Sequence, residues 1–375
     1  MTISIREYED ISKITDRFED DEITPILLGL FGEAGSVMTS VKKLKRESTA
    51  FIGFENSVID ELGDTFWYFA ALVRRLDFSM EELLGKVVTD GPNSRGFQPT
   101  DDPARPFASV RETNVEACDM ADALLRLGET TTALFKAAEV GEAIQESDLL
   151  GFLGAYFQVV ASAEISFNRV LTSNAEKIKD RFVPPVLEDM PDFDASFPEP
   201  EQLPREFAIE MRERENGKVY LRWRGVFIGD PLTDNIREED WFRYHDVIHF
   251  AHAAILHWSP TIRSLLKQKR KSRPDFDEGE DGGRGTVVEE GLAAWVFSKA
   301  KDLDYFDGHD KISIDILKGI KDFVRGYEVE SCPASLWEKA LIEGYAVFRQ
   351  VRDNKGGIII GDRTKRTIEY RPLED

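Results

Sequence analysis

Three carboxylates are candidates for a chemical role because each of them interrupts an apolar segment. Glu61 and Asp64 lie three residues apart in IDELGDTFWYFAAL, and Glu33 lies in ILLGLFGEAGSV. At about 3.6 residues per turn, Glu61 and Asp64 leave the same face of a helix. Acids beside such apolar runs are costly to bury unless they are paired or bind a metal. Antiparallel packing of the two helices would bring all three carboxylates together.

A cluster of carboxylate oxygens favours Mg²⁺, or Mn²⁺, over zinc. An ion held in this way can activate water and neutralise charge that develops on phosphate groups. The alternative is that the three acids lie on a solvated helix edge, since a single Glu-x-x-Asp pair is common. The combination of both acidic segments with the apolar run that follows Asp64 favours the metal site.

A second group of residues that could take part in chemistry is rich in histidine. Four of the five histidines lie in YHDVIHFAHAAILHW, and three of them recur at i, i+4 and i+7 on one helical face. Carboxylates at the start of a later apolar helix could complete a transition-metal or phosphate-chemistry site. Its candidate residues are His245, Asp246, His249, Glu289 and Glu290. The alternative is a pair of helices with buried, hydrogen-bonded histidines and solvated acids.

The elements that would position the first acids are helices. Apolar residues that recur at three- and four-residue steps predict helices over 23–44, 57–76 and 80–88. A loop rich in Gly and Pro follows at 91–106, and helical periodicity resumes over 112–181. We therefore expect a helical domain over 1–90 that carries the acidic site, and a second helical segment over 110–183.

The two helical segments share a faint internal repeat. LLGLFGE, which ends at Glu33, resembles LLRLGE, which ends at Glu129. In the second copy Phe152 and Ala155 stand where the other two acids would be expected. Two amphipathic segments can also align this well by chance. If the repeat is real, residues 1–183 pack as a tandem pseudo-dimer in which one copy keeps the acids and the other is scaffold.

The rest of the chain has a different pattern. Residues 184–204 are rich in Pro and acidic residues, cannot form a helix interior, and are predicted to be a linker. Residues 205–375 are predicted to form a helical domain with short β-hairpins in KVYLRWRGVFIGD and GGIIIGDRTKRTIEYRP. The expected fold class is mainly α. We find no resemblance of 205–375 to a defined family.

Composition restricts the partners of the protein. The formal net charge is −22 over 375 residues, which argues against binding to duplex nucleic acid. The sequence contains no run of eighteen apolar residues that would predict a membrane-spanning helix, so no membrane partner is expected. Two cysteines are too few for a disulfide framework, and the charged N-terminus lacks an apolar signal core. A reducing, cytoplasmic location is expected.

Two segments carry a specific family resemblance. GLFGEAGSVMTSVKK, followed by IDELGDTFWYFAALVRRLDFSMEEL, resembles the MazG-like all-α nucleoside triphosphate pyrophosphohydrolases. The resemblance covers about residues 1–183 and is strongest over 23–84. It implies a helical bundle in which Glu33, Glu61 and Asp64 hold Mg²⁺ or Mn²⁺. The implied reaction is hydrolysis of a nucleoside triphosphate, or a related nucleotide, to the monophosphate and pyrophosphate.

The resemblance also suggests residues that bind the nucleotide. NAEKIKDRF is similar to the Asn-x-x-Lys-x-x-x-Arg segment of the family and supplies Asn174, Lys177 and Arg181, although at the end of the second repeat. Lys42 and Lys43 follow the first acid and could bind triphosphate oxygens, or could be cations that complement a helix C-terminus. The second repeat would replace the partner that family enzymes obtain by dimerising. Whether the chain in addition forms a homo-oligomer is left open by the sequence.

Two departures from the family pattern leave competing interpretations. Gly32 and Ser36 stand where the family commonly has acids, and a hydroxyl is a weaker Mg²⁺ ligand than a carboxylate. A non-catalytic nucleotide-sensing module is therefore the first alternative to an enzyme. A second alternative places the main chemistry in the histidine-rich site, with the N-terminal half as an oligomerisation scaffold.

Overall fold

The computed structural model describes residues 3–19, 22–89, 117–139 and 143–373. The chain is mainly α-helical with one small sheet, which confirms the expected fold class. It divides into two compact units, Met1–Val183 and Pro184–Asp375. The predicted loop at 91–106 lies outside the described residues. Within the described residues no single helix is long and apolar enough to cross a membrane, and the helices Glu146–Ser162 and Phe167–Phe182 pass that test only as a pair bent by 99°.

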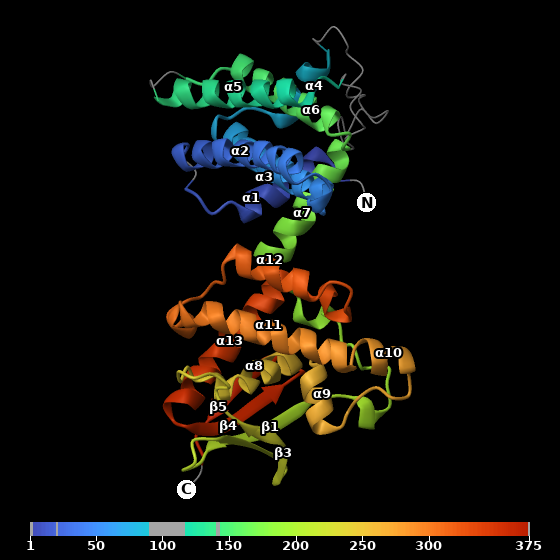
Figure 1. The fold of residues 1–375 in the computed structure, drawn as a ribbon. Helices are drawn as coiled ribbons and strands as arrows, with labels where there is room; N and C mark the ends of the chain where they lie inside the picture. Colours follow the sequence, from blue (N-terminus) through green and yellow to red (C-terminus); the bar gives the residue numbers. More distant parts are fainter. Residues whose placement is uncertain (1–2, 20–21, 90–116, 140–142, 374–375) are drawn as a thin grey trace. The chain divides into compact units, whose positions relative to one another are not determined.

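Helices make up the first unit (Figure 1). They are α1 (Ile5–Thr15), α2 (Thr24–Glu47), α3 (Phe54–Arg75), α4 (Met80–Thr89), α5 (Met120–Glu139), α6 (Glu146–Ser162) and α7 (Phe167–Phe182). The periodicity did not predict α1, which begins at a capping box. The Ser4 hydroxyl accepts the Glu7 N–H, and the Glu7 carboxylate accepts the Ser4 N–H. These bonds satisfy N–H groups that have no partner inside the helix.

The first unit packs as helical hairpins. Helix α2 pairs with α3, α5 pairs with α6, α2 also contacts α5, and α7 contacts α3 and α1 (Figure 1). Aromatic rings fill the shared core, where Phe69 and Phe152 stack with centroids 4.7 Å apart. Tyr156 donates a hydrogen bond from its buried hydroxyl to the Leu62 carbonyl over 2.9 Å. The second helical segment therefore packs on the first within one unit.

A five-stranded sheet and helices form the second unit. The helices are α8 (Asp246–Ala251), the π-helix η5 (His252–Leu256), α9 (Pro260–Leu266), α10 (Pro274–Gly279), α11 (Gly283–Lys301), α12 (Ile314–Phe323) and α13 (Ala334–Asp353). The strands are β1 (Glu206–Glu213), β2 (Val219–Trp223), β3 (Val226–Leu232), β4 (Gly356–Asp362) and β5 (Thr367–Arg371). The sheet is antiparallel with the order β3-β2-β1-β4-β5. Both expected hairpins are present, and β1, which was not anticipated, joins them.

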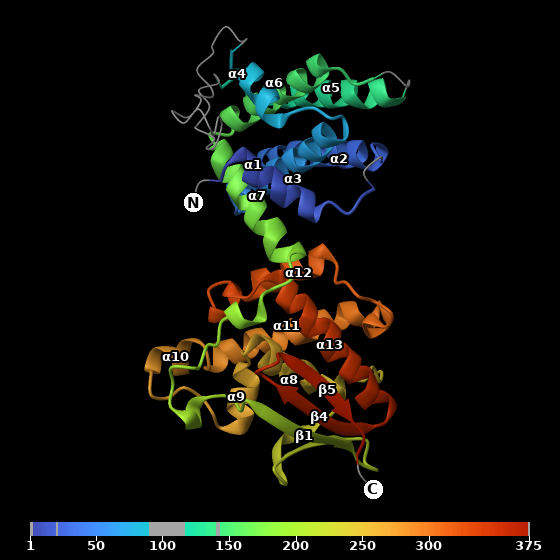
Figure 2. The same ribbon diagram turned by 180° about the vertical axis from the view of Figure 1, so that it is seen from behind.

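Strand β1 is central because one of its faces is apolar. Phe207, Ile209 and Met211 alternate along the strand and are buried. Phe207 lies 5.8 Å from Phe250 of α8, ring centre to ring centre, and α13 contacts β4 and β5 (Figure 2). A Cβ at Gly361 would lie 2.1 Å from the Phe207 ring, so glycine at this position permits the close approach of β4. The sheet thus packs its apolar face against α8 and α13.

The segment predicted as a linker, residues 184–204, is part of the second unit. Asp194 is 1% exposed and accepts hydrogen bonds from the guanidinium groups of Arg263 and Arg363 and from the Leu203 N–H. Leu203 lies in the apolar core of the unit. Acidic residues of the segment 184–204 bind buried arginines, and its apolar residues pack into the core. The segment is therefore an integral part of the second unit and not a free linker.

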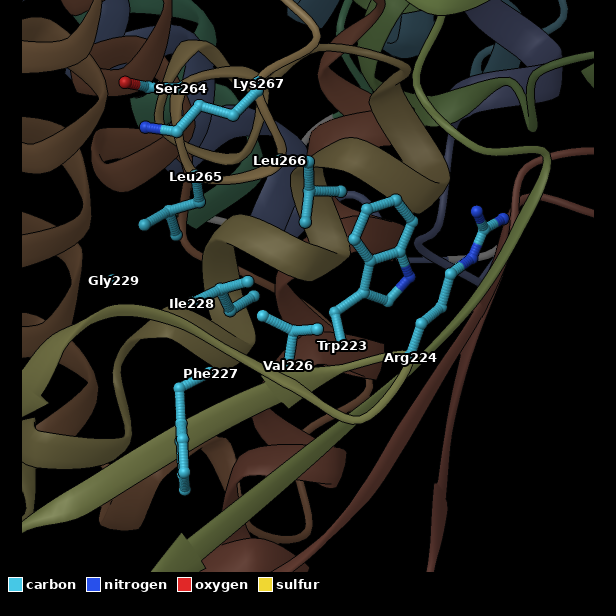
Figure 3. Close-up of a pocket in the computed structure, with 10 residues that line it drawn as sticks. All are labelled: Trp223, Arg224, Val226, Phe227, Ile228, Gly229, Ser264, Leu265, Leu266 and Lys267. Carbon is cyan, nitrogen blue, oxygen red and sulfur yellow. The ribbon is translucent and has the colours of Figure 1, made fainter.

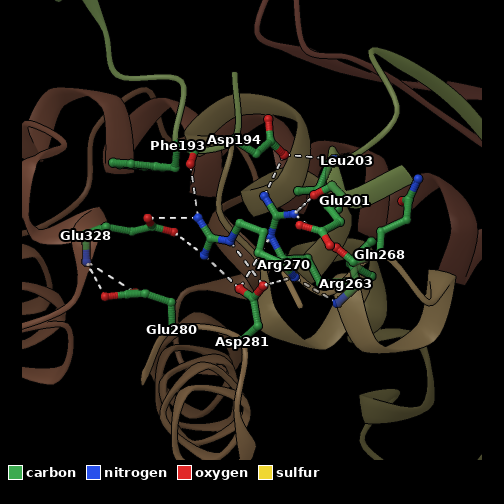
Figure 4. Close-up of polar contacts among 12 residues, drawn as sticks. Phe193, Asp194, Glu201, Leu203, Arg263, Gln268, Arg270, Glu280, Asp281 and Glu328 are labelled. Carbon is green, nitrogen blue, oxygen red and sulfur yellow. Dashed lines mark hydrogen bonds and ion pairs between the residues drawn. The ribbon is translucent and has the colours of Figure 1, made fainter. Parts of the chain in front are cut away.

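Further buried ion pairs connect the segments before and after α10 with the 3-10 helix η7 (Glu328–Ser331) (Figure 4). Arg270 is fully buried, and its guanidinium lies 2.7 Å from carboxylate oxygens of both Asp281 and Glu328. Both oxygens of Glu280 accept the Glu328 N–H, over 3.2 and 3.3 Å. Burial, with a smaller contribution from the neighbouring charge of Glu328, raises the pKa of Glu280 from 4.5 to about 7.

The raised pKa of Glu280 predicts a pH-dependent gain in stability when its charge is removed. A folded-state pKa above the unfolded value stabilises the fold at low pH, and this stability is lost as pH rises from 4.5 through about 7. Glu280→Gln keeps an acceptor for the Glu328 N–H. At pH 8 it should raise the free energy of unfolding by about 1–2 kcal/mol, after allowance for solvent screening.

Urea denaturation at pH 4.5 and pH 8 measures this gain, which should almost vanish at the lower pH. Glu278→Gln is the matched control because Glu278 is exposed two residues away. An equal effect of Glu280→Gln at both pH values would contradict the assignment.

Candidate functional site

Helices α2 and α3 bring the predicted acids together. Glu33 comes from α2, Glu61 and Asp64 come from α3, and one carboxylate oxygen of each lies within 4.8 Å of the others. All three side chains are partly buried. The pairing of α2 with α3 therefore produces the cluster that the apolar settings of these acids suggested.

The clustered charges disturb the ionisation of Glu33. Its pKa is raised from 4.5 to about 7, first by burial, then by the charges of Asp64 and Glu61 and a hydrogen bond to Glu61. Three carboxylates this close repel each other when all are ionised. A divalent cation bound to these oxygens would offset the repulsion, and the all-oxygen donor set fits Mg²⁺ or Mn²⁺.

Helix α7 adds an amide and an ammonium group to the same place. Asn174 donates a hydrogen bond from Nδ2 to Oδ1 of Asp64 over 2.9 Å, and Lys177 Nζ lies 2.6 Å from the same oxygen. Tyr8 donates its hydroxyl to Oδ1 of Asn174 over 2.8 Å, which fixes the orientation of the amide. Sequence reasoning found Asn174 and Lys177 through the family resemblance but missed Tyr8, because it did not predict α1.

The other predicted substrate-binding cations are placed differently. Lys42 is exposed, and nine residues after Glu33 it lies about 180° around the helix, on the opposite face. The ammonium of Lys43 lies 4.6 Å from the centre of the Phe51 ring. The guanidinium of Arg181 lies 4.9 Å from the ring centre of Phe182 and is one helical turn after the α7 lysine. The structure therefore does not bring Lys42 to the acids.

The two departures from the family pattern lie on the exposed side of α2. The Ser36 hydroxyl donates to the Gly32 carbonyl over 3.2 Å, within its own helix. A Cβ built at Gly32 meets nothing within 4 Å, so this position has room for a larger side chain. The protein ligands of a metal here would be three carboxylates rather than a larger set.

Gly63 allows α7 to approach the acids. A Cβ at Gly63 would lie 2.7 Å from the Asn174 Cβ, closer than such atoms approach in proteins. Gly63→Ala should push α7 away from α3 and break the hydrogen bond from Asn174 to Asp64. We expect a loss of about 1–3 kcal/mol in the free energy of unfolding, which overrides the usual helix-propensity gain of alanine.

Thermal denaturation followed by circular dichroism tests the role of Gly63. The matched control is Gly154→Ala in α6, where an added Cβ meets nothing within 4 Å. This control should be neutral or stabilising by up to about 1 kcal/mol. Equal melting temperatures for the two variants would contradict the close-approach argument.

The histidine-rich segment also forms a cluster, inside the second unit. His245 and His249 are buried, and their Nε2 atoms lie 3.5 and 3.4 Å from Oε2 of Glu290 on α11. Oδ1 of Asp246 lies 3.3 Å from Nε2 of His245. The structure therefore brings together the residues that the sequence selected, with the histidines buried and Glu290 partly exposed.

Glu289 lies on the inner side of this cluster and is fully buried. Its Oε1 is 3.1 Å from Nδ1 of both His249 and His252, and its Oε2 accepts hydrogen bonds from the Ser259 hydroxyl and the Thr261 N–H. Burial alone would raise the pKa of Glu289, but the two imidazoles outweigh burial and lower it to about 2. Burial likewise opposes protonation of His249, yet the carboxylates raise its pKa well above the ordinary value.

A pocket of about 520 Å³ lies elsewhere in the second unit, between the β2–β3 hairpin and α9 (Figure 3). Trp223, Phe227 and Leu265 line it together with Arg224 and Lys267. None of the site residues predicted from the sequence contributes to its wall. The cavity therefore does not coincide with either cluster.

Comparison with known proteins relates the second unit to a family. Residues 188–374 match the model of the MazG C-terminal domain. The second unit is therefore similar to this domain, and the match includes the whole histidine and glutamate cluster. The resemblance inferred from the sequence was placed in residues 1–183, and 205–375 was expected to belong to no defined family. The expectation for residues 205–375 is wrong, because the match covers them. The match supports a MazG-like relationship in the C-terminal half, and the resemblance of residues 1–183 stays a prediction.

One curated relative also matches. The Gene 37 protein of Mycobacterium phage L5 is 43% identical over 54 residues, which are 14% of this chain and 47% of the relative. The aligned part thus spans about half of the relative's length. No solved structure matches this chain.

Proposed function

We propose that the chain is a Mg²⁺- or Mn²⁺-dependent nucleotide pyrophosphohydrolase whose active site is formed by Glu33, Glu61 and Asp64. The observation that carries this proposal is the convergence of the three carboxylates with Asn174 and Lys177. Helices α2, α3 and α7 supply these groups, so the site combines anionic metal ligands with a cation suited to phosphate.

The groups have complementary roles in the proposed reaction. Water adds to the α-phosphorus of a nucleoside triphosphate, and the bond to the bridging oxygen of the leaving pyrophosphate breaks. A divalent ion would neutralise phosphate charge and lower the pKa of bound water. The carboxylates would orient that ion, while the Lys177 ammonium would pair with a phosphate oxygen. Asn174, held by Tyr8, would keep Asp64 in position.

Both halves of the chain support the proposal. Residues 1–183 resemble MazG-like pyrophosphohydrolases in their acidic motifs, and residues 188–374 match the MazG C-terminal domain. A nucleotide-sensing role without turnover is the alternative, and Gly32 and Ser36 are the residues that favour it.

A substrate screen tests the proposal on the full chain. Ribo- and deoxyribonucleoside triphosphates are incubated with Mg²⁺ or Mn²⁺, and released pyrophosphate and monophosphate are quantified. Equal amounts of the two products, dependent on the metal, are expected for at least one triphosphate. Metal-dependent nucleotide binding with no turnover would instead establish the sensing role, and release of inorganic phosphate alone would contradict the proposed cleavage position.

A further inference from the structure

We propose that His245, His249 and Glu290 form a second metal site, which binds a divalent transition-metal ion within the MazG-related unit. This inference does not depend on the pyrophosphohydrolase proposal, because the acidic cluster lies in the other unit. Its candidate ligand atoms are the Nε2 atoms of both imidazoles and Oε2 of Glu290, with a carboxylate oxygen of Asp246 beside them.

The spacing of these atoms fits a coordination polyhedron. Metal–nitrogen and metal–oxygen bonds of about 2.0–2.2 Å in a tetrahedral site place neighbouring ligand atoms roughly 3.3–3.6 Å apart. Nε2 of His245 lies 3.3 Å from Oδ1 of Asp246 and 3.5 Å from Oε2 of Glu290, and Nε2 of His249 lies 3.4 Å from the same Glu290 oxygen. Each of these contacts has the separation expected between neighbouring ligands of one ion, and ligand atoms of His245, Asp246 and His249 lie within 4.8 Å of one another.

Neighbouring groups select the tautomer that a metal needs at His245. Its Nδ1 lies 2.8 Å from the Phe242 carbonyl, which can only accept, so Nδ1 carries the proton. A lone pair on Nε2 then faces the cluster. The Phe242 ring stacks on the imidazole with centroids 4.0 Å apart and holds its plane. Such second-layer contacts orient histidine ligands in metal sites.

His249 adds an independent observation, because its ring nitrogens face carboxylates but form no well-directed hydrogen bond with any described residue. Its side chain is fully buried, and neither ring nitrogen makes a hydrogen bond of acceptable geometry within the described residues. Nδ1 faces the Glu289 carboxylate at 3.1 Å, which favours a proton on Nδ1 and leaves Nε2 directed at Glu290. Buried polar atoms are seldom left without a partner, and a metal ion would supply one for Nε2.

The donor set indicates the class of metal. Two imidazole nitrogens with carboxylate oxygens suit Zn²⁺, Co²⁺ or Fe²⁺, whereas Mg²⁺ prefers oxygen ligands alone. The Glu290 side chain is 41% exposed, while both histidines are buried. An ion at this site would therefore be reached from solvent on the Glu290 side, which leaves one side open for water or a ligand.

Metal titration of the full chain tests the second site. The protein is stripped with a chelator and titrated with Zn²⁺ by calorimetry, and with Co²⁺ by absorption spectroscopy, in excess Mg²⁺. We expect one Zn²⁺ per chain and Co²⁺ bands typical of tetrahedral coordination. Glu290→Gln and His245→Gln should each weaken Zn²⁺ binding by at least about 100-fold, more than the loss of a second-layer contact.

Two controls keep this test specific. His309→Ala removes an exposed histidine from the same unit, and Asp64→Asn alters only the acidic cluster, so both should bind Zn²⁺ normally. Circular dichroism of each variant monitors folding, and Glu290→Gln is suited to this because its side chain is partly exposed. Unchanged Zn²⁺ affinity in both site variants, or loss of Zn²⁺ in Asp64→Asn, would overturn the proposal.

Discussion

Asp64→Asn is expected to lower metal-dependent pyrophosphate release by at least about 1000-fold, while the fold stays intact. Asparagine preserves the shape of the side chain but removes the charge that the metal and Lys177 require. Its amide oxygen can still accept the hydrogen bond from Asn174, so the contact between α3 and α7 is retained. Steady-state pyrophosphate release and a Mn²⁺ titration measure the two effects, on turnover and on metal affinity.

Glu129→Gln is the control for this experiment. Glu129 is the exposed residue of α5 that occupies the corresponding place in the repeat, but Phe152 and Ala155 replace its acidic partners. It should retain normal turnover because no acidic cluster surrounds it. If Asp64→Asn retains turnover as well, Asp64 is not a metal ligand and the proposed active site is wrong.

Arg270→Met should destabilise the second unit by about 3–5 kcal/mol. The fully buried guanidinium contacts Asp281 and Glu328, and its removal leaves two shielded carboxylates without their main cation. Methionine is similarly long and unbranched but loses the guanidinium that lies over the Phe197 and Phe276 rings, so the change reports on the ion pairs and these cation–π contacts together. Urea denaturation followed by tryptophan fluorescence is a suitable measurement, because five of the six tryptophans lie in this unit.

Arg273→Met provides the matched comparison three residues later. Arg273 pairs with Asp275 over 2.8 Å, but both side chains are more than half exposed. Water screens such pairs, so we expect a change of no more than about 1 kcal/mol. Similar destabilisation by the two substitutions would show that the burial of Arg270 does not govern its contribution.

Local sequence patterns predicted much of the secondary structure near the candidate sites. Apolar periodicity predicted helices close to α2, α3 and α4, and β-branched and aromatic residues predicted both hairpins. These signals are local, because the backbone geometry of a helix or strand sets the spacing of residues on one face. The two unpredicted elements have short or interrupted patterns: α1 depends on the Ser4 capping box, and β1 carries charges between its buried positions.

The acidic cluster was accessible from sequence for a similar reason. Glu61 and Asp64 share a face because they are three residues apart, and Glu33 is recognisable as an acid within an apolar helix. His245, the N-cap of α8, and His249 within that helix follow the same logic, since i and i+4 positions lie one above the other. Helical geometry alone thus determined which side chains could act together within each element.

Only the tertiary structure decided how separate elements complete these sites. Asn174 reaches Asp64 across 110 positions of sequence because Gly63 leaves room for α7. His245 and His249 meet Glu290 because α8 packs against α11. Contacts of this kind depend on side-chain volume and on the burial of apolar faces by distant segments. The spacing of residues in the sequence reveals neither side-chain volume nor burial by distant segments. The sequence therefore identified the candidate groups, and tertiary packing determined which partners they contact.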